Sequence, residues 1–103
     1  MFEYNPHHKI SIENILNAVA SVFEVKISDI TGSSRLKSIA IARQVAMFLA
    51  KELVNDSLAK IASYFGGKTH STLLHAAKKI EREMSTNETL KRQIQMAKRQ
   101  IES

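Results

Sequence analysis

The sequence contains no cysteine, no tryptophan, one proline and three glycines among its 103 residues. The absence of cysteine excludes disulfides, thiolate metal sites and thiol nucleophiles, and it fits a reducing cytoplasm. The small number of helix-breaking residues favours long helices. No apolar run approaches the length of a membrane span, and residues 1–10 lack the apolar centre of a signal peptide. We therefore expect a cytoplasmic protein with no membrane partner.

What the sequence does have is an uneven distribution of charge. Residues 1–34 hold two lysines and four acidic residues, a net charge of −2, whereas residues 35–103 hold thirteen Lys or Arg and six acidic residues, a net charge of +7. Such a segregated excess suits a polyanion such as the phosphate backbone of a nucleic acid. On charge alone, an ordinary solvated basic surface explains the pattern equally well.

The hydrophobic pattern predicts an all-α, compact helical domain of about five to six helices over residues 10–103, preceded by an arm or linker stub at residues 1–9. Asn5-Pro6 breaks any helix in that stub, and Ser11 is the expected N-cap of the first helix. The other elements are expected at 28–30 (a short helical turn), 38–54, 58–65, 69–84 and up to residue 102. Asn55-Asp56-Ser57 is expected to cap the helix at 58–65, and Ser85-Thr86-Asn87 to cap the last one. The last helix carries one apolar stripe, formed by Leu90, Ile94, Ala97 and Ile101.

The segment from residue 58 to residue 84 has the layout of a helix-turn-helix. Gly66-Gly67 allows a tight turn with positive backbone angles, and the helix after it begins with polar residues. We expect Thr69, His70, Ser71 and Thr72 in the first turn of that helix, where side chains meet base edges in the major groove. A helical hairpin with a Ser/Thr cap is the alternative. One capping residue would suffice for it, so four polar residues in a row after Lys68 favour DNA reading.

Two other interpretations of this region, a P-loop and a metal site, are not supported by the sequence. Gly67-Lys68-Thr69 imitates the end of a phosphate-binding P-loop, but Ala62 stands where the first glycine belongs and no strand precedes it. His70 and His75 are five positions apart, on different faces of a helix, which disfavours a shared metal. The sequence therefore predicts no enzyme, no catalytic residue, no metal site, no cofactor and no small-molecule substrate.

Basic residues outside the helix-turn-helix are less specific signals. Arg35 and Lys37 follow a Gly/Ser loop and could enter a narrow minor groove, although their spacing alone favours an ordinary exposed loop. Arg43-Gln44 lies within the long helix, away from its apolar face, so the pair is expected either at a phosphate or in solvent. Lys51 has the same two interpretations.

Taken together, the motifs are familiar in their order and spacing. From about Ile10 to its C-terminus the chain resembles the C-terminal DNA-binding domain (domain IV) of DnaA, the family of bacterial chromosomal replication initiators. The segments that carry the resemblance are Ala42-Arg43-Gln44-Val45-Ala46-Met47, Lys51-Glu52-Leu53, Ser57-Leu58, Phe65-Gly66-Gly67-Lys68-Thr69-His70-Ser71-Thr72, Leu74-His75-Ala76 and Lys79-Ile80.

The resemblance implies recognition of DnaA boxes, short A·T-rich duplex sites at replication origins, by a monomeric reading head of a larger ATP-dependent initiator. It implies that the residues after the glycine turn contact the major groove and that a loop arginine enters the minor groove. Further positions would lie at or near the DNA backbone. Carried over to this chain, these are Lys68, Thr69, His70, Ser71 and Thr72 for the major groove, Arg35 for the minor groove, and Arg43, Gln44, Lys51, Leu58 and His75 for the backbone.

This sequence departs from the family pattern in two places. The basic loop has Ser33 and Ser34 where some relatives have Arg or Lys, and the turn has Lys68-Thr69-His70-Ser71-Thr72 where the family commonly has Arg-Asp-His-Thr-Thr. Thr69 replaces an aspartate that can accept a hydrogen bond from a cytosine amino group, and Ser71 replaces a threonine, losing a methyl group available to thymine. The chain has no room for the family's ATPase module, so we expect either an excised domain or a small free-standing relative that competes for origin sites. The alternative functions are a free-standing helix-turn-helix transcriptional repressor and a helical protein-interaction module that uses the basic face or the apolar stripe of the last helix.

Overall fold

The computed structural model describes residues 10–102, which form six α-helices and no strand. The predicted all-α class is therefore confirmed, whereas the arm expected at residues 1–9 lies outside the described residues. In chain order the helices are α1 (Ile12–Phe23), α2 (Ile27–Ile30), α3 (Lys37–Leu53), α4 (Leu58–Ser63), α5 (His70–Met84) and α6 (Glu88–Glu102). No helix in this part of the chain is long and apolar enough to cross a lipid bilayer.

The helix starts follow the hydrogen-bonding residues that mark them in the sequence. At α1 the Ser11 hydroxyl accepts a hydrogen bond from the Asn14 N–H at 3.2 Å, and the Asn14 side chain accepts one from the Ser11 N–H at 3.0 Å. At α4 the Ser57 hydroxyl accepts a bond from the Lys60 N–H at 3.1 Å. These bonds satisfy N–H groups that a helix leaves free in its first turn. The predicted caps at Ser11 and Ser57 are thus confirmed.

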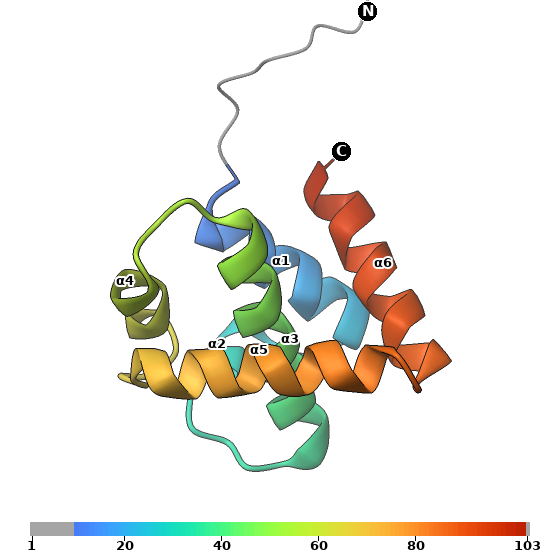
Figure 1. The fold of residues 1–103 in the computed structure, drawn as a ribbon, viewed down its shortest axis with the longest axis horizontal. Coiled ribbons are helices and arrows are strands. Elements are labelled where there is room, and N and C mark those ends of the chain that lie inside the picture. The colour runs from blue at the N-terminus through green and yellow to red at the C-terminus, as the bar shows by residue number, and fades with distance from the viewer. Residues whose placement is uncertain (1–9, 103) are drawn as a thin grey trace, which may run out of the picture.

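Helix α3 is the centre of the fold. It packs against α1, α2, α4 and α5, and six consecutive residues, 45–50, are buried. Six consecutive residues include every face of a helix, so this part of α3 is covered by neighbouring helices on all sides. In Figure 1, α5 runs across the front of α3 while α1 lies behind it, so the long helix acts as the scaffold that the sequence predicts.

The apolar stripe of α6 faces the interior. All four of its residues are buried, and α6 packs chiefly against α1, as Figure 1 shows. An ion pair between Lys98 and Glu52, 3.2 Å apart, also links α6 to α3. The stripe is therefore part of the domain's own core and is not free to hold a protein partner.

Candidate nucleic-acid interface

The helix-turn-helix consists of α4, the turn at residues 64–69 and α5. Phe65 is fully buried at the start of the turn, and Gly66 and Gly67 have φ angles of +67° and +77°. These values lie in the left-handed region that costs little for glycine alone. The predicted positive angles are confirmed. Helix α4 ends at Ser63 and not at the predicted Phe65, because the chain turns before the glycines are reached.

The glycine turn lies against the loop that joins α2 to α3. A methyl group placed on Gly66 would come within 3.0 Å of the Thr31 carbonyl oxygen, whereas one placed on Gly67 would meet no atom within 4 Å. Gly66 is thus needed for its backbone angle and for this close approach. The contact brings the start of the second helix of the motif beside the loop that carries Arg35.

Gly66→Ala is expected to lower the free energy of unfolding by roughly 2–3 kcal/mol, and Gly67→Ala by about 1–2 kcal/mol. Both variants strain a left-handed backbone position, but only the first also crowds the Thr31 carbonyl. Urea unfolding of the two variants measures the difference. Equal losses would mean that the packing of the turn on the loop adds nothing to stability.

The sequence predicts Thr69 in the first turn of α5. In the structure Thr69 is instead the N-cap, one position before the helix. Its backbone is extended, and its hydroxyl oxygen lies 3.3 Å from both the Thr72 N–H nitrogen and the Thr72 hydroxyl, accepting a hydrogen bond from the N–H. The threonine stops the helix from extending because its side chain satisfies the free N–H. His70, Ser71 and Thr72 form the first turn, and all three are exposed.

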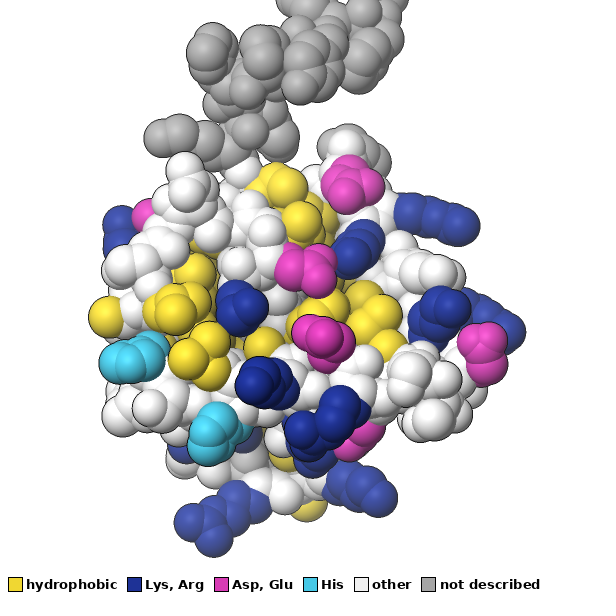
Figure 2. All heavy atoms as spheres, in the orientation of Figure 1, with side chains coloured by type: hydrophobic (Ala, Val, Ile, Leu, Met, Phe, Trp, Pro, Cys, Tyr) yellow, Lys and Arg dark blue, Asp and Glu magenta, His cyan; other side chains and the backbone are white. Residues whose placement is uncertain are grey.

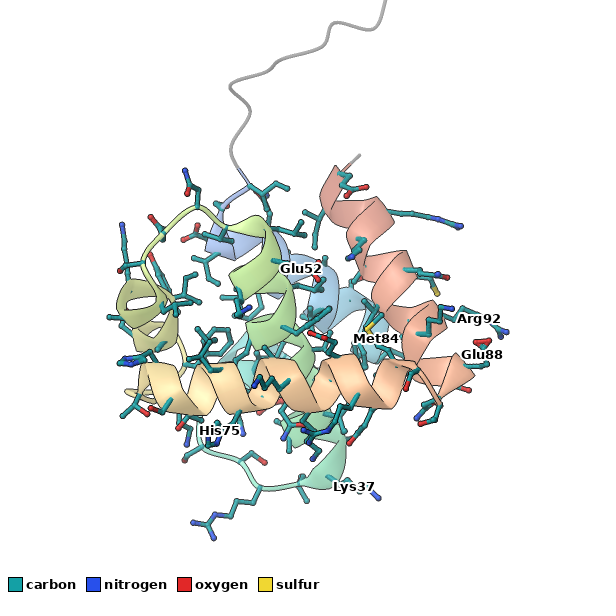
Figure 3. The ribbon with its side chains drawn as sticks, in the orientation of Figure 1. Lys37, Glu52, His75, Met84, Glu88 and Arg92 are labelled. Carbon is teal, nitrogen blue, oxygen red and sulfur yellow. The ribbon has the colours of Figure 1, made fainter. Side chains whose placement is uncertain are left out.

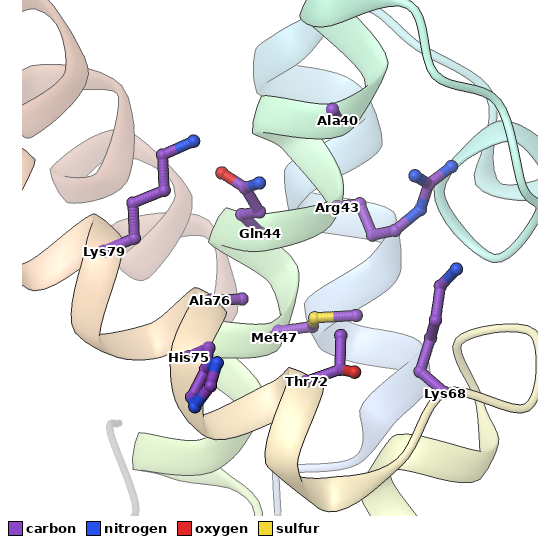
Figure 4. Close-up of a pocket in the computed structure, with 9 residues that line it drawn as sticks. All are labelled: Ala40, Arg43, Gln44, Met47, Lys68, Thr72, His75, Ala76 and Lys79. Carbon is purple, nitrogen blue, oxygen red and sulfur yellow. The ribbon is translucent and has the colours of Figure 1, made fainter.

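An open hollow of about 280 Å³ lies between α3 and α5 (Figure 4). Its lining contains five of the predicted site residues together with one lysine that was not predicted as a site residue. In Figure 4, Lys68 and Arg43 lie toward one end of the hollow and Gln44 and Lys79 toward the other. The full lining is Ala40, Arg43, Gln44, Met47, Lys68, Thr72, His75, Ala76 and Lys79.

Arg43 departs most from expectation. The sequence places it at a phosphate or in solvent, but it is only 8% exposed. Its guanidinium donates three hydrogen bonds to backbone carbonyls: Nε to Ile30 at 2.8 Å, Nη1 to Ser34 at 2.9 Å and Nη2 to Asp29 at 2.8 Å. The expectation of an exposed side chain is wrong because a loop folds back over the helix face that bears it.

Gln44, the neighbour of Arg43, is half-buried in the same hollow. Its side-chain carbonyl oxygen is buried and has no hydrogen-bond partner among the described residues. Leaving such an oxygen unpaired is unfavourable. Because the oxygen is buried, it can meet a ligand only if the side chain turns into the hollow.

The remaining predicted site residues lie outside the hollow. Arg35 is exposed on the loop between α2 and α3, and Lys37, labelled in Figure 3, is exposed at the first position of α3. Lys51 is exposed in the last turn of α3. Leu58 is half-buried at the start of α4 and packs against the core.

Lys79 is the site residue that sequence reasoning missed. It is half-buried and lines the hollow beside Gln44 and His75. Its position, four residues after His75 and seven after Thr72, places all three on one face of α5. That spacing is the signal that could have identified it.

The positive charges near the turn have few acidic partners. Within residues 10–102 the ion pairs involve Lys60, Lys79 and Lys98, so Arg35, Lys37 and Lys68 pair with none of the described carboxylates. Figure 2 shows Lys and Arg side chains over the face crossed by α5 and below it. Cations left unpaired in this way can attract an anionic polymer without first breaking an ion pair.

The residues of a P-loop or a metal site do not assemble. Gly67-Lys68-Thr69 joins two helices, with no strand before it in the described chain. Nor does any group of three His, Cys, Asp or Glu side chains suited to a metal form among residues 10–102. The site consists of hydroxyl, imidazole, amide and cationic groups, the donors and acceptors suited to bases and phosphates.

A family model described as the bacterial dnaA protein helix-turn-helix matches residues 12–80, which include the turn, the hollow and the Arg35 loop. The chain belongs to the DnaA family. The match supports DNA binding within a replication initiator, and recognition of DnaA boxes is the known role of this family.

Individual DnaA proteins give the same assignment. DnaA 1 of Protochlamydia amoebophila is 55% identical over 103 residues, which is 100% of this chain and 23% of that protein. DnaA 2 of Chlamydia pneumoniae is 50% identical over 101 residues, covering 98% of this chain and 22% of that protein. DnaA of Lacticaseibacillus casei is 46% identical over 86 residues, covering 84% and 19%. The chain thus spans about a fifth of the length of these relatives and matches the C-terminal domain of DnaA.

Proposed function

We propose that the start of α5 reads the major groove of a DnaA box while the loop of residues 31–36 places Arg35 in the adjacent minor groove. The observation that carries this proposal is the contact of Gly66 with Thr31, which holds the two reading elements side by side. A helix N-terminus in the major groove and an arginine in a narrow minor groove are complementary ways to read one duplex site.

The bases are read by the exposed first turn of α5. His70, Ser71 and Thr72 each offer a donor or an acceptor to a base edge. Thr69 has its hydroxyl engaged in the cap, so its contribution is the methyl group, which suits thymine. A neutral hydroxyl engaged in the cap is a weaker acceptor for a cytosine amino group than an ionised aspartate. We therefore propose that the base preference at this position differs from that of relatives with the acid.

The phosphates are held by side chains around the readers. Lys68 lies in the turn and lines the hollow, as do Gln44, His75 and Lys79. Lys37 and Lys51 extend this set along α3, and Leu58 contributes an apolar contact near the backbone. Such contacts fix the orientation of the protein and supply most of the affinity without reading sequence.

In the longer initiator this chain serves as the reading head at the replication origin, in the cytoplasm. We propose that it contributes no catalysis itself. We also propose that it binds a box as a monomer, because the apolar stripe of α6 is buried inside the domain and leaves no such face for a second copy. A transcriptional repressor would use the same residues on an operator. An interaction module would use the basic face to hold an acidic protein, and it would show no preference among duplexes.

Two single substitutions test the division between reading and anchoring. His70→Ala is expected to weaken binding to a DnaA-box duplex by about 1–3 kcal/mol and to leave a scrambled duplex nearly unaffected. Lys51→Ala is expected to weaken binding to both duplexes alike, since a phosphate contact carries no sequence information. Fluorescence anisotropy with the two duplexes measures both effects.

Ser63→Ala, a substitution at an exposed residue of α4 outside the proposed interface, serves as the matched control, and circular dichroism confirms that each variant is folded. If His70→Ala and Lys51→Ala weakened every duplex to the same extent, the start of α5 would not be the reading element.

A further inference from the structure

We propose that Arg43 is a positioning residue: its guanidinium latches the loop of residues 31–36 so that Arg35 is presented to DNA in a fixed orientation. The proposal rests on the proposed function, in which Arg35 enters a minor groove. It assigns Arg43 a role through the loop, in place of the direct phosphate contact that the family resemblance implies.

The latch joins three points of one segment. Nε and Nη2 donate to the carbonyls of Ile30 and Asp29, at the end of α2, and Nη1 donates to the carbonyl of Ser34. The Ser34 carbonyl belongs to the same peptide unit as the Arg35 N–H. Arg43 therefore fixes both the exit of α2 and the peptide that leads directly into the reading residue.

The first half of the loop is also held by other contacts, since Thr31 and Gly32 donate to carbonyls of α2 and Gly66 packs against Thr31. Little besides Arg43 holds the second half, which carries Arg35. The apolar anchors on either side, Ile30 and Ile39, are nine positions apart, and Leu36 between them is 67% exposed. The other hydrogen bonds in the second half of the loop are local: the Leu36 N–H donates to the Ser34 hydroxyl at 3.3 Å, and the Leu36 carbonyl accepts from the Ala40 N–H at 2.8 Å. A segment with few buried contacts opens easily, so its order depends on the bonds from Arg43.

The chemistry of arginine suits this task and competes with phosphate binding. A guanidinium presents five N–H donors in a rigid plane, and three of them point at carbonyls here. Turning the group toward a phosphate would break all three bonds. The Asp29 carbonyl would keep the bond from the Gly32 N–H at 3.3 Å, but the Ile30 and Ser34 carbonyls would lose the donor that Arg43 supplies, which is most costly at Ile30, where the bond is buried. Lysine, with one nitrogen on a flexible stem, cannot span the three carbonyls.

A double-mutant cycle in box binding tests the latch. Arg43→Lys is expected to weaken binding to a DnaA-box duplex by about tenfold, similar to Arg35→Ala, although it keeps the positive charge. In the Arg35→Ala background, Arg43→Lys is expected to change the affinity by less than about twofold, since the residue through which it acts is already absent. Independent, multiplying losses, or retention of wild-type affinity by Arg43→Lys, would overturn the proposal.

Nuclear magnetic resonance supplies the readout that does not depend on DNA. In Arg43→Lys, the heteronuclear NOE of the Arg35 and Leu36 amides is expected to fall while that of core amides in α3 and α5 is unchanged. If Arg35→Ala left box affinity intact, the proposed minor-groove contact would fail, and the NOE would still decide the latch. An unchanged NOE in the loop would overturn it.

If Arg43→Lys does not fold, the latch can still be tested on the wild-type protein. The Arg43 Nε–H is expected to exchange slowly with solvent and to keep its chemical shift when a DnaA-box duplex is added. Fast exchange in the free protein, or a large shift on binding that signals transfer to a phosphate, would contradict the latch.

Discussion

Phe65→Ala is expected to lower the free energy of unfolding by about 3–5 kcal/mol, the largest loss of stability that we predict for a single substitution in this domain. Phe65 is among the largest fully buried side chains and directly precedes the glycine turn. Removing its ring loses the apolar burial and leaves a cavity that the neighbouring helices fill only in part. Domains of this size have a total stability of about 5–15 kcal/mol, so the variant will be near the limit of folding.

Thermal and urea unfolding measure this effect, and Met96→Ala is the matched control. Met96 is also a large apolar side chain, but it lies on α6 and is 51% exposed, so its truncation is expected to cost less than about 0.5 kcal/mol. Comparable losses in the two variants would mean that the ring of Phe65 is not the anchor of the turn.

Raising the salt concentration from about 50 to 200 mM is expected to weaken DNA binding by roughly a hundredfold. The proposed interface has four lysines at phosphates, Lys37, Lys51, Lys68 and Lys79, and each phosphate neutralised releases counterions from the duplex. Four such contacts give a slope of about −3.6 in a plot of log affinity against log salt concentration. Anisotropy titrations at several salt concentrations measure the slope directly.

Single substitutions assign the slope to residues. Lys51→Ala is expected to make the slope shallower by about 0.9, whereas Arg92→Ala on α6 is expected to leave it unchanged. Arg92, labelled in Figure 3, is exposed on the side of the molecule away from the turn. Affinity that hardly responded to salt, or an equal effect of Arg92→Ala, would contradict this placement of the phosphate contacts.

Much of the fold was predictable because local rules and tertiary packing agree. Ser11 and Ser57 cap helices in the structure as they do in the sequence pattern, and the two glycines adopt the positive angles that their turn needs. The stripe of α6 is buried in full because a helical period of apolar residues requires a partner surface, here supplied by α1.

The features that could not be predicted depend on contacts between distant segments. Arg43 lies off the apolar face of its helix, so periodicity assigns it to the surface. It is buried because carbonyls 9 to 14 residues earlier fold over it. A single sequence does not specify where a Gly/Ser loop will run. The same reason hid the role of Gly66 beside Thr31, whereas Lys79 was missed although its spacing on α5 was visible.

The placement of Thr69 shows a different difficulty. Threonine is acceptable both as an N-cap and as a first-turn residue, and the choice depends on which N–H its hydroxyl reaches. The structure gives the cap, since the Thr72 N–H donates to it. The group of polar residues was identified correctly from the sequence, and the boundary was off by one position.

Base reading by the start of α5 is best tested by the affinity of the wild-type protein for two duplexes at moderate salt: a DnaA-box duplex and a scrambled duplex of the same length and composition. Specific binding by base contacts predicts that the box is preferred by at least about a thousandfold. It also predicts that both affinities fall with salt while the preference persists. Equal affinity for the two duplexes would contradict base reading by the start of α5 and would favour an interaction module that uses the basic face.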